Sequence, residues 1–255
     1  MVKTIAVVNQ KGGVGKTTTT VNLAYALAGQ NQRVLAVDTD PQASLTFYMG
    51  HDERELERQE KTLYHAILGQ RSALDIVQGA NPALLPAGIS LAKADAELIT
   101  EPGGSWVLKE AMAPIVEDYD YALIDCPPTL TILTVNALAA VERVLIPVKT
   151  DLLSTLGIPQ LLDTIAKVQR RANPRLGVLG ILPTMFNPTY GHDSEVLHEI
   201  RDTFGGSVKV FEPIRRSTAF DRAAGTGDAS VRLNPNMPGA KAYQDLARTL
   251  IKEFA

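Results

Sequence analysis

The feature that most constrains the fold is a glycine-rich segment, Asn9–Thr18, which reads NQKGGVGKTT. It stands between a short apolar run, Thr4–Val8, and a helical pattern that begins at Lys16. A strand, a glycine-rich turn and a helix in this order make the loop that binds nucleotide phosphates. Glycines allow a tight turn that aims backbone N–H groups into one concavity, and the helix N-terminus adds partial positive charge. The segment therefore predicts a nucleotide-binding α/β protein.

The residue types in this segment have separate predicted tasks. Lys16 supplies a full charge to the β- and γ-phosphates, and the Thr17 hydroxyl is a ligand for Mg²⁺. The remaining phosphate-binding positions are Gly12, Gly13, Val14, Gly15 and Thr18. The usual pattern, GxxxxGK followed by Ser or Thr, would have Gly at position 10, where this chain has Gln10. Glycines, Lys and Thr at this spacing between strand and helix are far more specific than a glycine-rich turn alone.

A second lysine, Lys11, precedes the glycines. A lysine at the start of the loop lies on the far side from Lys16, so it is poorly placed to reach the γ-phosphate bound by its own loop. In a face-to-face dimer it could reach the partner's nucleotide, as an arginine finger does in trans. Geometry alone does not distinguish a lysine that reaches the partner's nucleotide from a lysine that faces solvent.

Apolar runs alternate with helical patterns along the whole chain. Further strands are predicted at Val34–Val37, Tyr121–Ile124, Val144–Val148 and Leu176–Leu182. Helices are predicted at Lys16–Ala28, Trp106–Val116, Thr131–Ala140, Thr155–Arg171, His192–Phe204 and about Pro238–Phe254, and His51–Glu60 is expected to be a solvated surface helix or loop. Runs that are apolar on successive residues are typical of parallel strands buried on both faces. The chain is therefore expected to be one doubly wound α/β domain over residues 1–255, with a mostly parallel sheet flanked by helices.

Composition excludes several other classes. With 45% hydrophobic and 21% charged residues, the chain is not disordered, and a net charge of −3 does not fit a basic nucleic-acid coat. The single cysteine, Cys126, excludes an internal disulfide framework, and no apolar run approaches the ~18 residues of a membrane span. Residues 1–150 carry 12 Lys+Arg against 17 Asp+Glu, and the rest carry 13 against 11. That asymmetry is either chance or a basic face built late in the chain.

Carboxylates follow two of the predicted strands. Val34–Val37 leads into Asp38 and Asp40, and Tyr121–Ile124 leads into Asp125. Ligands bind at the carboxyl ends of strands in such sheets, so these side chains are expected beside the phosphate loop. Asp125 would hold a water on Mg²⁺. Asp38 and Asp40, two apart on a strand, would face the same way; the alternative is a turn stabilised by Asp and Pro.

These motifs together resemble one family. KGGVGKTT resembles the deviant Walker A loop of the ParA/MinD family of P-loop ATPases, DTDPQ its Walker A′ motif, and the segment after Tyr121–Asp125, Cys126-Pro127-Pro128, its switch II. The resemblance runs from Thr4 to the last helix and is closest to the short ParA/Soj partition ATPases. It implies that Lys11 crosses a dimer interface, that Asp40 positions and polarises the attacking water, and that Asp38 supports Mg²⁺ or the loop's hydrogen bonds. Cys126 is most simply a small buried residue.

The later matches imply where the base binds. Thr184-Met185 resembles a family segment that ends a strand, and Pro213–Arg215 resembles the segment whose backbone contacts the adenine, although the order here is Pro-Ile-Arg rather than Ile-Pro-Arg. Met185, Pro213 and Arg215 are therefore the candidate adenine contacts. Asp151, where relatives often have Glu, is expected at the dimer face.

The family resemblance also implies a function. The chain would be a slow ATPase that uses ATP and Mg²⁺, dimerises with ATP, binds DNA without sequence preference and hydrolyses ATP when a ParB-like or other cargo-bound activator arrives. It would act in chromosome or plasmid segregation, in the cytoplasm on the nucleoid. Candidate DNA contacts are Arg201, Arg215, Arg216, Arg222 and Arg248, with Arg170, Arg171 and Lys252 as further basic residues of the late half. For each of these, a solvated charge is the alternative.

The same phosphate loop also occurs in proteins with other functions. The cargo could be a protein body such as a carboxysome. A membrane-cycling regulator of the MinD kind would need a basic amphipathic tail beyond the last helix, and the sequence ends at Ala255. An enzyme with the same loop, such as a synthetase, would need a second substrate pocket or cluster ligands. No helix-turn-helix domain is expected before the first strand, so a repressor that recognises an operator is not predicted.

Overall fold

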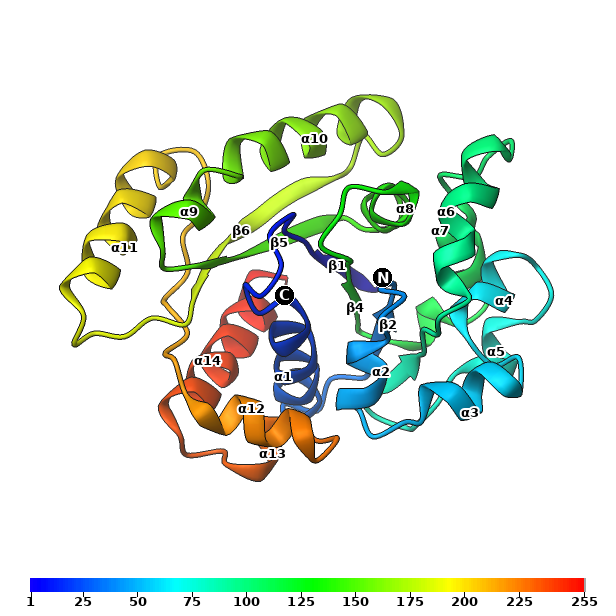
Figure 1. Cartoon of the computed structure of the whole chain (residues 1–255), viewed down its shortest axis with the longest axis horizontal. Coiled ribbons are helices and arrows are strands. Elements are labelled where there is room, and N and C mark those ends of the chain that lie inside the picture. Colours follow the sequence, from blue (N-terminus) through cyan, green and yellow to red (C-terminus); the bar gives the residue numbers. More distant parts are fainter. Residues whose placement is uncertain (255) are drawn as a thin grey trace.

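A parallel sheet forms the centre of the molecule, with helices on both of its faces (Figure 1). The structure is a computed structural model that describes residues 1–254. The described strands are β1 (Lys3–Val7), β2 (Val34–Asp38), β3 (Ala83–Leu85), β4 (Tyr121–Asp125), β5 (Arg143–Lys149) and β6 (Gly177–Thr184), in the order β3-β2-β4-β1-β5-β6. Every pairing between them is parallel. The predicted doubly wound α/β fold is confirmed.

Helices of very different lengths lie between these strands and after the last of them. The long ones are α1 (Lys16–Ala28), α6 (Leu91–Thr100), α8 (Ile132–Ala140), α10 (Ile158–Arg171), α11 (Gly191–Phe204), α12 (Thr218–Gly225) and α14 (Pro238–Glu253). The short ones are α2 (Ser44–Tyr48), α3 (Glu53–Arg58), α4 (Leu63–Ile67), α5 (Ala73–Ile76), α7 (Val107–Met112), α9 (Leu152–Thr155), α13 (Ser230–Leu233) and a 3₁₀ turn at Val116–Asp118. Most of the short helices lie between β2 and β4; α9 lies between β5 and β6, and α13 follows β6.

The sheet separates two apolar cores. Ile124 and Ile146 belong to the core under α8 and α10, while their neighbours Leu123 and Leu145 belong to the core under α1 and α14. Successive side chains of a strand point to opposite faces, so a strand covered on both sides must be apolar at every position. This is why the strand sequences read as unbroken apolar runs.

The last helix braces the helix that follows the phosphate loop. The Thr19 hydroxyl on α1 lies 3.0 Å from the Tyr243 hydroxyl on α14, and both are buried. On the same face, the Val231 amide donates to Asn22 Oδ1 at 3.0 Å. Burial raises the pKa of Tyr243, so its hydroxyl keeps its proton for this hydrogen bond. The position of α1 therefore depends on the C-terminal quarter of the chain.

Two helices predicted from the sequence are shorter than expected, and prolines account for both. The predicted helix Trp106–Val116 ends at Met112, because the ring of Pro114 clashes with the preceding turn and has no N–H to donate. The predicted helix Thr155–Arg171 begins only at Ile158, as α10, with Pro159 in its first turn because proline cannot donate to the Thr155 carbonyl; Thr155 itself ends the separate short helix α9. The charged segment His51–Glu60 contains α3, a surface helix, as expected.

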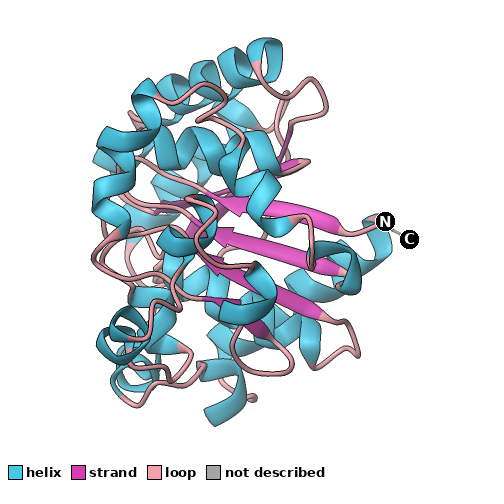
Figure 2. Ribbon diagram, turned by 90° about the vertical axis from the view of Figure 1, so that its right-hand side faces the viewer, coloured by secondary structure: helices cyan, strands magenta, loops and turns pink. Residues whose placement is uncertain are grey.

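The two ends of the described chain meet at the amino edge of the sheet. The Lys3 amide donates to the Asp120 carbonyl at 2.9 Å, and the Phe254 ring packs edge-on against Tyr121, with 6.2 Å between centroids. Figure 2 shows both ends beside the starts of the strands, opposite the loops that leave the carboxyl edge. Among the helices of the described residues, none combines the length and the apolar character needed to cross a membrane.

Candidate functional site

The phosphate loop joins β1 to α1 at the carboxyl edge of the sheet. Gly13 and Gly15 have positive φ angles of 70° and 84°, in a backbone region that residues with a side chain rarely adopt. A Cβ placed on Gly12 or Gly13 would meet nothing within 4 Å, so this side of the loop is open. The loop at Gly12 and Gly13 therefore borders open space rather than packed side chains.

Strands β5 and β6 hold the loop in place. Asn9 Nδ2 donates to the Pro147 carbonyl at 2.7 Å, and Asn9 Oδ1 accepts from the Lys11 amide at 2.9 Å. At the other end, the Thr184 hydroxyl donates to the Val14 carbonyl at 2.8 Å. These bonds fix the loop before any ligand binds, which lowers the entropy cost of binding.

The first turn of α1 is tied to the end of β4. Lys16 is buried, and its Nζ donates to the Lys11 carbonyl at 3.1 Å. Burial lowers the pKa of Lys16, while the charge of Asp125 opposes that shift. The Thr17 hydroxyl donates to Asp125 Oδ2 at 2.7 Å, and the Thr20 hydroxyl donates to Oδ1 at 3.2 Å. The structure thus brings together Lys16, Thr17 and Asp125, as the motifs predicted.

Two buried carboxylates lie side by side on β2 and β4, where Asp38 and Asp125 are register partners. Both are fully buried. Burial raises the pKa of Asp38 to about 7 and that of Asp125 to about 8, the latter with a further contribution from the charge of Asp38. Asp38 Oδ2 accepts hydrogen bonds from the amide and the hydroxyl of Thr46, at 2.9 and 2.8 Å. Asp38 therefore holds the segment that follows β2.

The prediction that Asp38 and Asp40 face the same way along a strand is wrong, because β2 ends at Asp38. Asp40 lies in the following turn, where its amide donates to Asp38 Oδ1 at 3.1 Å and its own Oδ1 accepts from the Gln42 amide at 2.9 Å. These are the bonds of an Asp-stabilised turn. The turn leaves Asp40 partly exposed, unlike the two buried carboxylates.

The donor set fits a magnesium ion held mainly by phosphate and water. The oxygens of Thr17 and Asp125 lie 2.7 Å apart, and such hard oxygen donors suit Mg²⁺. The raised pKa of Asp125 also shows a carboxylate that a nearby cation would stabilise. In residues 1–254, no group of three or more His, Cys, Asp or Glu side chains is arranged to hold a metal alone. Thr17 and Asp125 are the residues that would hold Mg²⁺ beside a bound nucleotide.

Lys11 is paired within its own chain. Its Nζ lies 2.9 Å from Asp151 Oδ1 and 2.9 Å from the Ser154 hydroxyl, and Lys149 Nζ lies 3.0 Å from Asp151 Oδ2. Burial raises the pKa of Asp151, but the hydrogen bonds from Ser154, Lys11 and Lys149 outweigh it and hold that pKa well below its ordinary range. The sequence suggested a solvent-facing or a partner-facing lysine; the structure places it in an ion pair at the rim of the loop.

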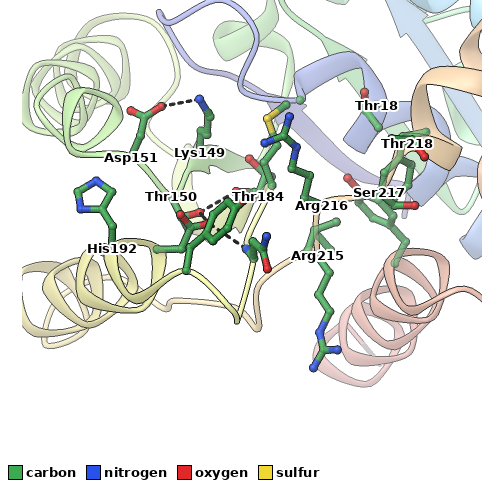
Figure 3. A pocket seen from close by; sticks show the side chains of 18 residues that line it. Thr18, Lys149, Thr150, Asp151, Thr184, His192, Arg215, Arg216, Ser217 and Thr218 are labelled. Carbon is green, nitrogen blue, oxygen red and sulfur yellow. Dashed lines mark hydrogen bonds and ion pairs between the residues drawn. The ribbon is translucent and has the colours of Figure 1, made fainter.

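A cavity of about 400 Å³ opens beside the loop (Figure 3). Gly15 and Thr18 line one end, Lys149 and Asp151 the other, and Ile214–Thr218 form a wall. Met185, one of the predicted adenine contacts, lines the cavity and has a strained positive φ of 56°.

The three predicted adenine contacts are placed differently. Arg215 lines the cavity as Met185 does, but Pro213 is not among the lining residues, and Arg216 takes a place beside Arg215 instead. Figure 3 shows the Arg216 side chain running up between Lys149 and Thr18, while Arg215 extends away alongside α14. The wall of the cavity is thus formed by Ile214–Thr218, which begins one residue after Pro213.

The candidate DNA contacts fall into two groups. Arg201 lies 3.2 Å from Glu212, Arg248 is paired with Asp245, and Arg222 donates to the Thr218 hydroxyl. Carboxylates neutralise the first two in part, which weakens them as phosphate contacts. Arg215 and Arg216 are exposed and have no acidic partner among the side chains that the structure describes.

Several residues that build the site were not predicted. Thr20 and Thr39 donate to the side chain and the backbone carbonyl of Asp125, Thr46 holds Asp38, and Ser154 shares Asp151 with Lys11. The run of four threonines at the start of α1 was a usable signal for Thr20. Thr46 and Ser154 give no signal, because their partners are fixed by how the following loops turn back.

Comparison with known proteins agrees with this geometry. Residues 2–178 match the family model described as an AAA domain. The chain is 37% identical to the sporulation initiation inhibitor protein Soj of Bacillus subtilis, covering 97% of this chain and 98% of Soj. It is 36% identical to the chromosome partitioning protein ParA of Myxococcus xanthus, covering 97% and 87%. A crystal structure of cobyrinic acid a,c-diamide synthase from Mycobacterium smegmatis, with a bound ATP analogue and magnesium, is 36% identical and superposes with a TM-score of 0.87 over 100% of this chain and 96% of that one.

Proposed function

The chain belongs to the ParA/MinD family of P-loop ATPases, and from this premise we propose that it is a partition ATPase that ATP converts into a DNA-binding dimer. One observation carries the proposal. The loop holds two lysines, of which Lys16 is buried over the loop while Lys11 stands at its rim beside Asp151. One lysine serves the chain's own nucleotide, and the other is free to serve a partner's once its ion pair opens.

The proposed nucleotide site divides its tasks among these residues. Lys16 and the loop backbone, Gly12–Thr18, hold the phosphates. Thr17 and Asp125 hold Mg²⁺, which would neutralise charge on the phosphates, and Asp38 keeps the β2–α2 segment in place. Asp40 orients the attacking water, and the cavity lined by Met185 and Arg215 receives the adenine. ATP and Mg²⁺ in this role are supported by the diamide synthase structure, which contains an ATP analogue and magnesium.

Replacement of Lys11 by alanine should separate ATP binding from dimer formation. Lys11 does not face the phosphate side of its own loop, so monomeric Lys11→Ala should bind ATP as the wild type does. It should fail to dimerise with ATP, because the charge that crosses to the partner is gone. Light scattering with ATP and with ADP measures this, with Lys61→Ala as an exposed-lysine control. An unchanged ATP dimer would make Lys11 an ordinary rim residue.

Hydrolysis is proposed to be slow until an activator arrives. A switch must stay closed until its partner binds, so basal turnover should be far below the ~1–100 s⁻¹ of kinases. The activator would be a ParB-like protein or another protein bound to the cargo. After hydrolysis the dimer separates and leaves the DNA.

DNA binding is proposed to depend on the dimer. Each monomer offers few unpaired basic residues, of which Arg215 and Arg216 are the clearest. Joining two such faces on one duplex raises affinity by about 10²–10⁴-fold through effective concentration. DNA binding then depends on the nucleotide state although DNA and ATP need not touch, and the protein would associate with the nucleoid.

The test of this proposal is DNA retention with ATP against ADP. Retention should require ATP, ignore sequence and fall steeply as salt rises. The double variant Arg215→Glu/Arg216→Glu should retain less DNA than the double variant Arg54→Glu/Arg58→Glu on α3. Arg215 and Arg216 both line the cavity, so the ATP affinity of the double variant is measured as well. The single variant Arg215→Glu is a second control, because the Arg215 side chain extends away from the cavity. Equal retention with ADP and ATP would overturn the proposed switch.

A synthase function like that of the diamide synthase has less support. Such an enzyme must hold a second, large substrate next to the γ-phosphate. The cavity beside the loop, about 400 Å³, suits a single nucleotide. A second cavity of about 300 Å³ is lined by Val2, Met112 and Val141, at the amino edge of the sheet and away from the phosphate loop. A partition ATPase needs only the first cavity.

A further inference from the structure

Over Leu153–Leu156, at the end of α9, the polar side chains are buried and the apolar ones are exposed, the reverse of the usual arrangement. Ser154 and Thr155 are buried, whereas Leu153 and Leu156 are 71% and 70% exposed. The burial of Ser154 has a clear cause, because its amide and its hydroxyl both bind Asp151 and its hydroxyl also accepts from Lys11. The cluster that holds Lys11 thus takes the inner side of α9 and turns the leucines toward solvent.

The leucines border the phosphate loop. Strand β1 lies between β4 and β5, so the loops that leave those two strands flank the loop that leaves β1. Leu153 and Leu156 follow β5, and Leu130, 37% exposed, follows β4. Figure 1 shows α9 on one side of the phosphate loop and the start of α8 on the other. Apolar side chains therefore stand on both sides of the exposed Gly12 and Gly13.

We propose that Leu153 and Leu156 are the apolar anchors of the contact between two copies of this chain when nucleotide is bound. This inference rests on the proposed function, since it takes the nucleotide-dependent dimer as given. In a two-fold dimer the same patch meets itself, and a patch centred on leucines can do so without burying an unpaired polar group. The leucines lie within five residues of Asp151, the residue from which Lys11 must separate to cross to the partner.

The charges in the patch suit a second copy that carries nucleotide. Lys11 and Lys149 share the single carboxylate of Asp151, so the cluster has one positive charge in excess. Two such clusters repel each other. Phosphates bound in the adjacent loop of each copy supply the opposite charge, so the faces become complementary only with nucleotide. DNA is not the expected occupant, because two leucines offer nothing to a phosphate backbone.

The test replaces both leucines and leaves the nucleotide site intact. Leu153→Ser/Leu156→Ser is compared with Leu74→Ser/Ile99→Ser, whose side chains are 60% and 71% exposed on α5 and α6, across the molecule from α9 (Figure 1). Dimerisation is measured by sedimentation velocity with a non-hydrolysable ATP analogue and Mg²⁺. Binding of a fluorescent ATP analogue is measured at protein concentrations where all variants are monomeric. Melting temperatures check that each variant is folded.

The leucine variant should bind the analogue as the wild type does and dimerise about tenfold more weakly or worse, because apolar area that the dimer would bury is lost. The control pair should stay within about twofold of the wild type. If wild type and control dimerise and the leucine variant does so equally well, the anchors are wrong while the proposed function stands. The anchors are also wrong if the leucine variant dimerises normally and has lost only its response to an activator protein. If the wild type remains monomeric with the analogue, the proposed dimer fails and the anchors fail with it.

Discussion

Lys16→Ala is expected to abolish nucleotide binding, with a loss of affinity of at least about 100-fold. Lys16 is buried and its Nζ is directed at its own loop. The binding of phosphates in this loop therefore depends on the charge of Lys16. A 100-fold loss corresponds to about 2.8 kcal/mol, which lies within the range of about 2–5 kcal/mol for truncating one side of a buried charged contact. Equilibrium binding of a fluorescent ATP analogue measures the change.

Two controls separate this loss from damage to the fold. Lys61→Ala removes an exposed lysine and should leave nucleotide affinity unchanged. Lys16→Ala itself should melt close to the wild-type temperature, because it removes a buried charge rather than a packed apolar group. Near-normal ATP affinity in a folded Lys16→Ala protein would mean that this loop does not hold the phosphates.

Asp40→Ala is expected to keep ATP binding and dimer formation while hydrolysis falls about 10²–10⁴-fold, the usual contribution of a residue that activates water. Asp40 is partly exposed in the turn after β2, whereas Asp38 and Asp125 are fully buried and engaged with threonines. Of the three carboxylates, Asp40 is therefore the one accessible to a water. Phosphate release under single-turnover conditions gives the rate.

Asp52→Asn is the matched control for this variant. Asp52 is exposed and caps α3 through its side chain, and asparagine caps equally well, so neither stability nor turnover should change. Asp40→Asn keeps the shape of the turn and removes only the charge, so it should resemble Asp40→Ala. Wild-type turnover by both Asp40 variants would remove Asp40 from the reaction.

The phosphate loop and the strands next to it could be predicted from the sequence, because local rules decide them. Tight turns need glycine, and strands covered on both faces are apolar at each position. These rules place Lys16 and Thr17 in the first turn of α1 and Asp125 at the end of its strand, and the pairing of β4 with β1 then brings Asp125 to them. The strand order, with β4 between β1 and β2, comes from packing and is not local, yet it is what sets Asp38 against Asp125.

The features that sequence reasoning missed depend on contacts between distant segments. Lys11 binds Asp151 and Ser154, which lie 140 and 143 residues away along the chain. The predicted strand Val34–Val37 extends one residue further, to Asp38, where hydrogen bonds from Thr46 hold the Asp38 carboxylate and the chain turns at Asp40. Strand β3 has three residues, too few for a periodic pattern to identify.

The placement of the two chain ends has a practical consequence. Lys3 and Phe254 both lie at the start of β4, on the edge of the sheet opposite the phosphate loop. A fluorescent protein or a surface tether attached beside Lys3 or Phe254 would lie on the side of the sheet opposite the phosphate loop, away from the nucleotide and from Leu153 and Leu156. Ends this close could also be joined by a short linker and the chain reopened in a surface loop, because such rearrangements keep every native contact. The molecule is thus well suited to imaging and immobilisation.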